Sequence, residues 1–226
     1  MDDWISAERE GKRAVFDQLA SIAKAAGSGR RLELLELLAQ GEHSVETLSR
    51  MSGMGVTLVS AHLQTLKRAG LVATRRQGTT VYYQLSGEDV AALFVAIKRV
   101  GLNHHPGTRD ALDEYLSEGA AGAGMPKTLP PAAVTGSMAV LDVRPLIEYE
   151  AGHIPGAASI PLHELGDRAS ELDRSVTVVV YCRGELCRQA LDAARWLCAQ
   201  GFDAVVMDEG VIEWRAGGGV ALHAVA

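Results

Sequence analysis

Two cysteines five residues apart offer the clearest chemistry in this sequence. Cys182 follows VTVVVY, a β-branched run typical of a buried strand, and Cys187 precedes a predicted helix. A thiolate at the end of a strand is stabilised by backbone N–H groups and by the positive end of the next helix dipole. Arg183 and Arg188 add positive charge. We therefore predict a lowered pKa for Cys182 and a nucleophile at neutral pH.

The same spacing admits a second chemistry. Cys182, five further residues and Arg188 match Cys-dependent phosphatases and arsenate reductases, in which the Arg and the loop amides hold an oxyanion. Tyr181, however, stands where those enzymes carry His, Gly184 comes one position early, and Gln189 replaces a hydroxyl residue. Oxyanion chemistry stays an alternative, and in both cases Gly184 allows a tight turn.

Alternating strands and helices position this loop. We expect strands at 138–144, 158–162, 176–182 and 203–208, with helices over 188–201 and from 212 onward. Such alternation predicts an α/β domain with a mostly parallel sheet covered on both sides. The preceding SEGAAGAGMPKTLPP is rich in small residues, Gly and Pro, which is typical of a linker. The predicted boundaries are 1–116 for a first domain, 117–131 for the linker and 132–226 for the second domain.

Three segments of the second domain, LDVRPLIEYEAGHIPGAASIPL, YCRGELC and DEGVIEWRAGG, resemble a single rhodanese-like domain over roughly 132–222. The resemblance implies that Cys182 accepts a sulfane sulfur as a persulfide and passes it to a thiophile. It also implies that the loop amides around that sulfur come from Arg183, Gly184, Glu185, Leu186 and Cys187.

Several neighbouring residues allow two interpretations. Cys187 is either a resolving thiol, which attacks the persulfide to give a disulfide or a sulfur-bridged loop, or a small buried residue at a helix start. Asp142 and Arg144 match a family motif that we interpret as mainly structural, and His153 and Trp214 likewise. Cys198, beside Trp196 and Leu197, is expected in the core.

The first hundred residues are mainly helical. Helices are expected over 6–26, 30–41, 44–53, 56–69 and 87–102, with Ser44 as an N-cap and Gly53-Met54-Gly55 as a turn. After Gly70 the hydrophobic period becomes two, and LVATRRQ and TTVYYQL flank Gly78, which predicts a β-hairpin. Two short helices followed by a basic hairpin favour a mainly α winged helix-turn-helix, with its second helix in the DNA major groove.

Residues on the exposed face of 56–69 and on the hairpin are the candidate DNA contacts. Small or amide side chains of the helix can approach base edges, and basic residues of the helix end and hairpin tip can meet phosphates. The candidates are Thr57, Ser60, Ala61, His62, Gln64, Lys67, Arg68, Arg75, Arg76 and Gln77.

The segment from VETLSRMSG to TTVYYQL, and above all the run from Ser60 to Val72, resembles the ArsR/SmtB family of bacterial repressors over roughly 10–100. The resemblance implies a homodimer, paired through the first and last helices, on a near-palindromic double-stranded operator.

Many members of that family sense metals, and here the sequence departs from the pattern. HSVETLS contains no cysteine at the usual ligand position. His104 and His105, near Asp110 and Asp113, form a poor chelate because adjacent helical residues point about 100° apart. We expect neither a metal nor a cofactor. His62 is interpreted as structural or as a phosphate contact, and His43 as a surface residue.

Charge is unevenly distributed along the chain. The net charge is −6, but residues 1–100 carry 13 basic and 11 acidic residues, against 9 and 17 in residues 101–226. Residues 50–85 contain five basic residues and no acidic one. A local basic surface of this kind favours phosphate contacts, although a solvated basic surface would look the same.

Composition places the protein in the cytoplasm. Hydrophobic residues make up 47% and charged residues 22%, as in globular proteins, and three cysteines do not form a disulfide scaffold. No apolar run approaches the ~18 residues that cross a bilayer, and MDDWISAEREGK is no secretory signal.

Together these features predict a DNA-binding regulator, presumed a repressor, that senses sulfane sulfur or redox state through Cys182. The donor would be thiosulfate, a persulfide or a polysulfide. Alternatives are an active sulfurtransferase with a DNA-binding module, a silent rhodanese scaffold, and the oxyanion enzyme.

Overall fold

The computed structural model describes residues 2–117, 126–217 and 221–224. The chain divides into two compact units, which are described separately. Unit 1 comprises Met1–Leu38 and Glu42–Val90, and unit 2 comprises Ala39–Gly41 and Ala91–Ala226. Within the described residues, no helix is both long and apolar enough to cross a membrane.

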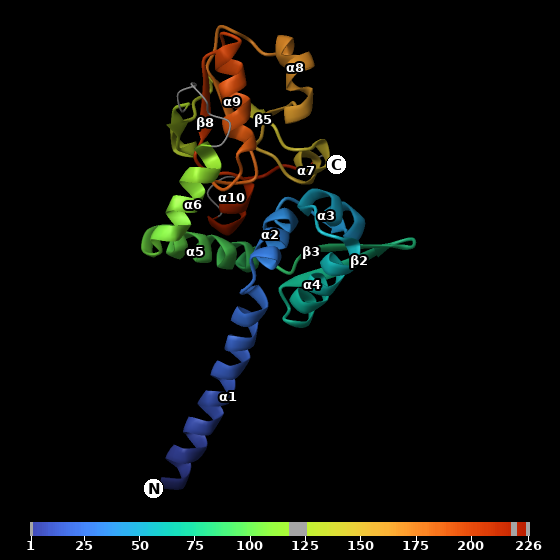
Figure 1. Ribbon diagram of the computed structural model, residues 1–226, viewed down its shortest axis with the longest axis vertical. Helices are drawn as coiled ribbons and strands as arrows, with labels where there is room; N and C mark the ends of the chain where they lie inside the picture. Colours follow the sequence, from blue (N-terminus) through green and yellow to red (C-terminus); the bar gives the residue numbers. More distant parts are fainter. Residues whose placement is uncertain (1, 118–125, 218–220, 225–226) are drawn as a thin grey trace. The chain divides into compact units, whose positions relative to one another are not determined.

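Unit 1 is a bundle of helices with a small antiparallel sheet (Figure 1). The sheet order is β1-β3-β2. Its elements are α1 (Asp2–Ala26), α2 (Gly29–Leu38), β1 (His43–Ser44), α3 (Val45–Ser52), α4 (Val56–Arg68), β2 (Val72–Gln77) and β3 (Thr80–Leu85). The predicted helices and hairpin are confirmed, whereas the two-residue β1 was not predicted because it is too short to show a period.

Local signals explain where these elements begin and end. Ser44 caps α3 by accepting a hydrogen bond from the Thr47 N–H at 3.2 Å, and Gly53 ends the helix in the left-handed region at φ 67°. Gly78 turns the hairpin at φ 60°. The shared core of α2, α3 and α4 consists of Leu34, Leu35, Leu48, Val59, Leu63 and Leu66, all almost fully buried.

Unit 2 begins with two helices, α5 (Glu88–His104) and α6 (Pro106–Ser117). The first three residues of α5 belong to unit 1, so this single helix continues from one unit into the other. Sequence periodicity predicted α5, but α6 was missed because it contains no fully buried residue and therefore shows no clear apolar stripe.

The rest of unit 2 is a five-stranded sheet of order β4-β8-β7-β5-β6, with every pair parallel. The strands are β4 (Thr128–Leu129), β5 (Ala139–Asp142), β6 (Ala158–Ser159), β7 (Val178–Tyr181) and β8 (Ala204–Met207). This confirms the predicted α/β architecture. Because β7 is central, its four residues are all buried, as the β-branched run indicated.

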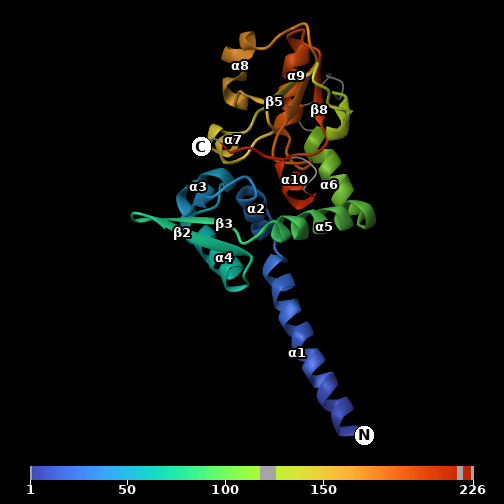
Figure 2. The ribbon, with the colours of Figure 1, turned by 180° about the vertical axis from the view of Figure 1, so that it is seen from behind.

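Helices cover both faces of this sheet (Figures 1 and 2). On one face, α8 (Leu165–Arg168) and α9 (Gln189–Ala199) pack against Val178 and Val180. On the other, α10 (Val211–Gly217) packs through Trp214 against Val179 and Tyr181, and Tyr149 of α7 (Leu146–Ala151) joins the same core. Three short 3-10 turns complete the unit: Pro131–Ala133, Leu162–Glu164 and Ala169–Glu171.

The predicted linker, 117–131, falls largely outside the described residues, because 118–125 are not described. Its last part is described: β4 lies at 128–129 and pairs with Val206 and Met207 of β8. The sheet therefore begins inside the segment predicted to be linker.

Candidate functional site

Cys182 stands directly after β7, where the parallel strands end at their carboxyl edge. Its side chain is only 4% exposed. The thiol donates to the carbonyl oxygen of Cys187 at 3.2 Å and lies 3.9 Å from that of Gly184. The loop closes on itself, because the Cys187 N–H donates to the Gly184 carbonyl at 2.9 Å. The five residues after Cys182 thus wrap around its sulfur atom and cover it.

The predicted low pKa of Cys182 is wrong for this conformation. Burial raises the pKa of the Cys182 thiol well above its ordinary value, and interaction with Cys187 raises it further. Backbone N–H groups of Ala190 and Gly184 lower it, as the expected amide cradle would, but they are outweighed. The sequence pattern indicated the cradle but could not indicate how completely the loop buries the sulfur.

The thiol with the lowered pKa is Cys187. A hydrogen bond from Cys182 lowers the pKa of Cys187 most, and burial opposes it. Backbone donation at Gln189 and the charge of Arg183 lower it further. Cys187 is also the more accessible of the two thiols. Of these two neighbouring cysteines, Cys187 is therefore the one that ionises at the lower pH.

The two arginines of the loop are engaged by carboxylates. The Arg183 guanidinium holds both oxygens of Glu148, at 2.6 to 3.1 Å, and Glu148 is fully buried in α7. Arg188 donates to Asp192 at 3.1 Å and lies over the Tyr115 ring, 5.3 Å from its centroid. An oxyanion enzyme needs its Arg aimed into the loop, so this geometry disfavours that alternative.

The backbone of the loop is seated against the turn that precedes α10. A Cβ atom on Gly184 would lie 2.8 Å from Glu213 Oε2 and from Ile212 Cγ2. A Cβ atom on Gly210 would lie 2.5 Å from the Cys182 carbonyl oxygen. Gly184 was predicted because the loop needs a tight turn there. Gly210, which contacts the Cys182 carbonyl, was missed because no sequence signal connects Cys182 to a residue 28 positions later.

Glu185 and Leu186 complete the loop. Glu185 points outward, with 43% of its side chain exposed, and its carboxylate lies 2.8 Å from Lys98 Nζ of α5. Leu186 is half-buried. Sequence reasoning did not identify Lys98, which lies outside the segment that resembles a rhodanese domain.

Asp142 and Arg144 form a fully buried ion pair at 2.6 Å. Arg144 also donates to the Gly152 carbonyl at 2.7 Å and to Gln40 Oε1 at 3.1 Å. His153 stacks on Tyr149 with ring centroids 3.8 Å apart. These contacts connect β5 to the segment around Gly152, and the mainly structural role of these residues stays a prediction.

Two single-residue predictions are wrong. His43, expected at the surface, is 1% exposed, because it lies in β1 beside Tyr83 of β3. Cys198, expected in the core, is exposed, because it lies in the last turn of α9 beyond the buried Leu197.

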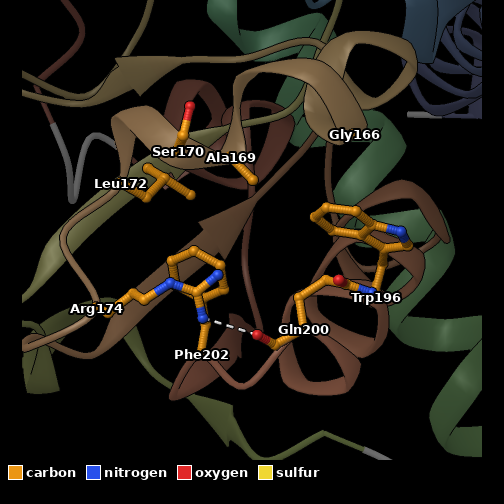
Figure 3. Close-up of a pocket in the computed structure, with 8 residues that line it drawn as sticks. All are labelled: Gly166, Ala169, Ser170, Leu172, Arg174, Trp196, Gln200 and Phe202. Carbon is orange, nitrogen blue, oxygen red and sulfur yellow. Dashed lines mark hydrogen bonds between the residues drawn. The ribbon is translucent and has the colours of Figure 1, made fainter.

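A cavity of about 400 Å³ lies elsewhere in unit 2 (Figure 3). Its lining includes Trp196 and Gln200, at the opposite end of α9 from the cysteine loop. Arg174 donates to the Gln200 carbonyl at 2.8 Å and lies over the Phe202 ring. None of the predicted sulfur-site residues lines this cavity, which also contains no cysteine.

The predicted DNA-contact residues lie on α4 and the β2–β3 hairpin of unit 1. All are exposed except Ser60 and His62, which are half-buried. Thr57, Ser60, Ala61 and Gln64 share one helix face because of their helical spacing. The fold therefore presents the small, amide and basic side chains on neighbouring elements, α4 and β2, which contact each other.

Several of these side chains are held in place. Gln64 donates to the Tyr83 hydroxyl at 3.0 Å, and Lys67 donates to Thr74 Oγ1 at 2.9 Å. Arg75 forms a bidentate ion pair with Glu42. The sequence predicted Arg75 as a DNA contact but did not indicate this ion pair. The guanidinium of Arg75 would have to exchange Glu42 for a phosphate on binding DNA.

No group of three or more His, Cys, Asp or Glu residues in the described part of the chain could hold a metal ion. His105 Nδ1 lies 3.2 Å from Thr108 Oγ1.

Comparison with known proteins yields two family matches. Residues 28–74 match the family of bacterial regulatory proteins called arsR, and residues 131–217 match the rhodanese-like domain. The HTH-type transcriptional regulator Rv0324 of Mycobacterium tuberculosis is 42% identical over 224 residues, covering 95% of this chain and 94% of that protein.

Two further relatives cover single parts. A sulfurtransferase of Allochromatium vinosum is 32% identical over 87 residues, 38% of this chain and 79% of that protein. The homodimeric winged helix-turn-helix domain Mb0332 of Mycobacterium bovis, a possible ArsR-family regulator solved by NMR, is 50% identical, with a TM-score of 0.40; it covers 42% of this chain and 87% of that one.

Proposed function

Because this chain belongs to the ArsR family of DNA-binding regulators and carries a rhodanese-like domain, we propose that it is a cytoplasmic repressor whose operator affinity responds to sulfane sulfur at Cys182. The observation that carries the proposal is the contact of Cys182 with Cys187 at 3.2 Å within one loop of the rhodanese-like domain. The proposed domain limits are those predicted from the sequence.

A near-palindromic operator and a homodimer are the partners we propose on the DNA side. The exposed face of α4 supports base contacts, and the hairpin residues support phosphate contacts. Pairing through α1 is supported by Val15, Phe16 and Leu19, each more than half exposed on one helix. Apolar side chains in such a row are costly in water and are covered in a dimer.

The sulfur step balances without an external oxidant. The Cys182 thiolate attacks the outer sulfur of a persulfide, a polysulfide or thiosulfate, and the remaining thiolate or sulfite leaves. The Cys187 thiolate then attacks the Cys182 sulfur, which releases hydrosulfide and closes a Cys182–Cys187 disulfide. The sulfane sulfur is reduced and the two cysteines are oxidised.

Burial of Cys182 bears on how this step begins. The loop must move before a donor can reach the sulfur, since the side chain is 4% exposed. Cys187, ionised first and adjacent, is placed to accept the Cys182 proton when the loop opens. A site that must open before it reacts suits a stoichiometric sensor better than an enzyme with rapid turnover.

Sulfurtransferase activity is the second candidate, supported by the relative named as a sulfurtransferase. Steady-state transfer of sulfur from thiosulfate to cyanide or to a thiol separates the two. Rapid turnover that disappears in Cys182→Ser favours the enzyme, whereas stoichiometric loading without turnover favours the sensor.

The deciding experiment uses the full chain and an operator isolated by selection from genomic DNA. Wild type, Cys182→Ser, Cys187→Ser and the control Cys198→Ser are treated with sodium tetrasulfide, desalted, and divided between mass spectrometry and DNA titration. Trypsin places each cysteine on a separate peptide, because Arg183, Arg188 and Arg195 lie between them.

We expect wild type and Cys198→Ser to gain sulfur or a disulfide and to lose operator affinity by about five- to 150-fold, the usual range of allosteric coupling. Identical titrations before and after loading would remove the sensor function.

A further inference from the structure

One lysine of α5 joins the sulfur loop to the turn against which the loop is seated. Lys98 Nζ lies 2.8 Å from a Glu185 oxygen and 2.6 Å from Glu213 Oε1. Its side chain is only 7% exposed, and that of Glu213 only 10%. A lysine this buried stays in place because both of its ion-pair partners are present. Burial lowers the pKa of Lys98, but Glu213 and Glu185 raise it by more, so the ammonium remains charged.

Glu213 is itself part of the wall of the loop. One of its oxygens binds Lys98, and the other accepts the Gly210 N–H at 2.9 Å. The same carboxylate stands where a side chain of Gly184 would be. Glu185, the other ion-pair partner of Lys98, belongs to the loop. Lys98 therefore holds the loop and its support together from a separate helix.

The helix that carries Lys98, α5, crosses the boundary between unit 1 and unit 2 in the chain. It follows β3 of the hairpin after two residues, and its first three residues belong to unit 1 while the rest belong to unit 2. A second contact reaches the end of the loop from α6, where Arg188 donates to the Tyr115 carbonyl at 3.3 Å. The middle of the loop, at Glu185, and the residue that follows the loop, Arg188, thus contact α5 and α6 as well as the rhodanese-like domain.

We propose that Lys98 is the positioning residue that keeps the Cys182 loop closed, and that its release on sulfur loading carries the change into α5. The first half depends on contacts alone, and the second rests on the proposed function. Reaction at Cys182 requires the loop to move, and movement of Glu185 breaks the Lys98 ion pair. By reciprocity, a shift of α5 on DNA changes how readily the loop opens.

The first test needs neither DNA nor sulfur. The reduced full chain is labelled with iodoacetamide at neutral pH, and the rate at Cys182 is followed on its own tryptic peptide. We expect Lys98→Gln and Glu185→Gln each to speed labelling by about three- to tenfold, as for contacting charged residues. The double variant is expected to label no faster than Lys98→Gln, because the change at Lys98 already removes the pair with Glu185 together with the pair with Glu213.

Matched controls make the test specific. Lys98→Arg keeps the charge and is expected to restore the wild-type rate. Arg99→Gln, the exposed neighbour on α5, and Glu150→Gln, an exposed carboxylate of α7, are expected to label like wild type. Should Lys98→Gln fail to fold, Glu185→Gln alone decides, because its carboxylate is 43% exposed and tolerates the change. An unchanged Cys182 rate in Glu185→Gln, or additive effects in the double variant, would overturn the positioning role.

The second test addresses the transfer to α5. Wild type and Glu185→Gln are loaded with tetrasulfide to the same extent by mass, and operator affinity is measured before and after loading. In wild type we expect a ratio between the operator affinities before and after loading that differs from one. In Glu185→Gln we expect this ratio to lie closer to one. A ratio equal to that of wild type would overturn the transfer. If wild type binds the operator equally well before and after loading, the sensor function fails. The positioning role of Lys98 still stands in that case, provided that the labelling result holds.

Discussion

The thiol of Cys182 donates to the backbone of Cys187, and it is Cys187, not Cys182, whose pKa is lowered. The thiol that was expected to be the more acidic is therefore the less acidic of the two. The thiol with the lowered pKa is the more accessible one, and the thiol with the raised pKa is buried.

This division predicts an order of labelling. Since the pKa of Cys187 is lowered, its alkylation begins at a lower pH than that of an ordinary thiol, and since the pKa of Cys182 is raised, its alkylation begins at a higher pH. Cys182→Ala removes the hydrogen bond to Cys187 and is expected to move the Cys187 midpoint upward. The measurement is the rate on each tryptic peptide against pH, with exposed Cys198 as the internal reference. Labelling of Cys182 before Cys187 would contradict the assignment.

The contact between Gly210 and the Cys182 carbonyl predicts sensitivity to one methyl group. Gly210→Ala places a carbon 2.5 Å from backbone atoms, so the loop or the turn must shift. We expect a loss of about 1 to 3 kcal/mol in unfolding free energy, as for overpacked sites, and faster alkylation of Cys182. Gly166→Ala is the matched control, because an added Cβ there meets nothing within 4 Å. Urea unfolding of both variants checks the difference, and equal stabilities would refute the predicted clash.

The buried pair of Asp142 and Arg144 predicts a large effect of removing one partner. Asp142→Ala leaves the Arg144 charge buried, and we expect a loss of about 3 to 5 kcal/mol. The exposed pair Arg30–Glu33 serves as comparison, and Glu33→Ala is expected to cost less than about 1 kcal/mol. Denaturant unfolding followed by circular dichroism measures both. Similar losses for the two variants would show that burial of the pair does not matter.

The exposed basic residues of the hairpin predict how DNA binding depends on salt. If Arg76 contacts a phosphate as proposed, Arg76→Gln is expected to weaken binding to all sequences and to reduce the salt slope by about one. Gln64→Ala, on the face of α4, is expected to relax discrimination between operator and other DNA by about 1 to 3 kcal/mol. Titrations at several salt concentrations, with Arg174→Gln as a control in unit 2, test both. An unchanged slope for Arg76→Gln would exclude that residue from the interface.

Local sequence patterns were sufficient to predict much of the secondary structure of this protein. The β-branched run before Cys182, the cap at Ser44 and the turn at Gly78 depend on neighbouring residues, so α1 to α5, the hairpin and the central strand could be predicted from the sequence. The helices α6, α7 and α8 were not predicted. The alternation of strands and helices likewise predicted the parallel sheet and the loop that carries both cysteines.

What could not be predicted depends on residues far apart in the chain. The burial of Cys182, the pairing of Arg183 with Glu148 and the contact of Lys98 with Glu185 and Glu213 join positions separated by dozens of residues or by whole elements. A pKa follows from such surroundings, because desolvation and nearby charges act through space rather than along the chain. The sequence therefore predicted which thiols react, whereas three-dimensional packing decides which of them has the lowered pKa and which of them lies near α5.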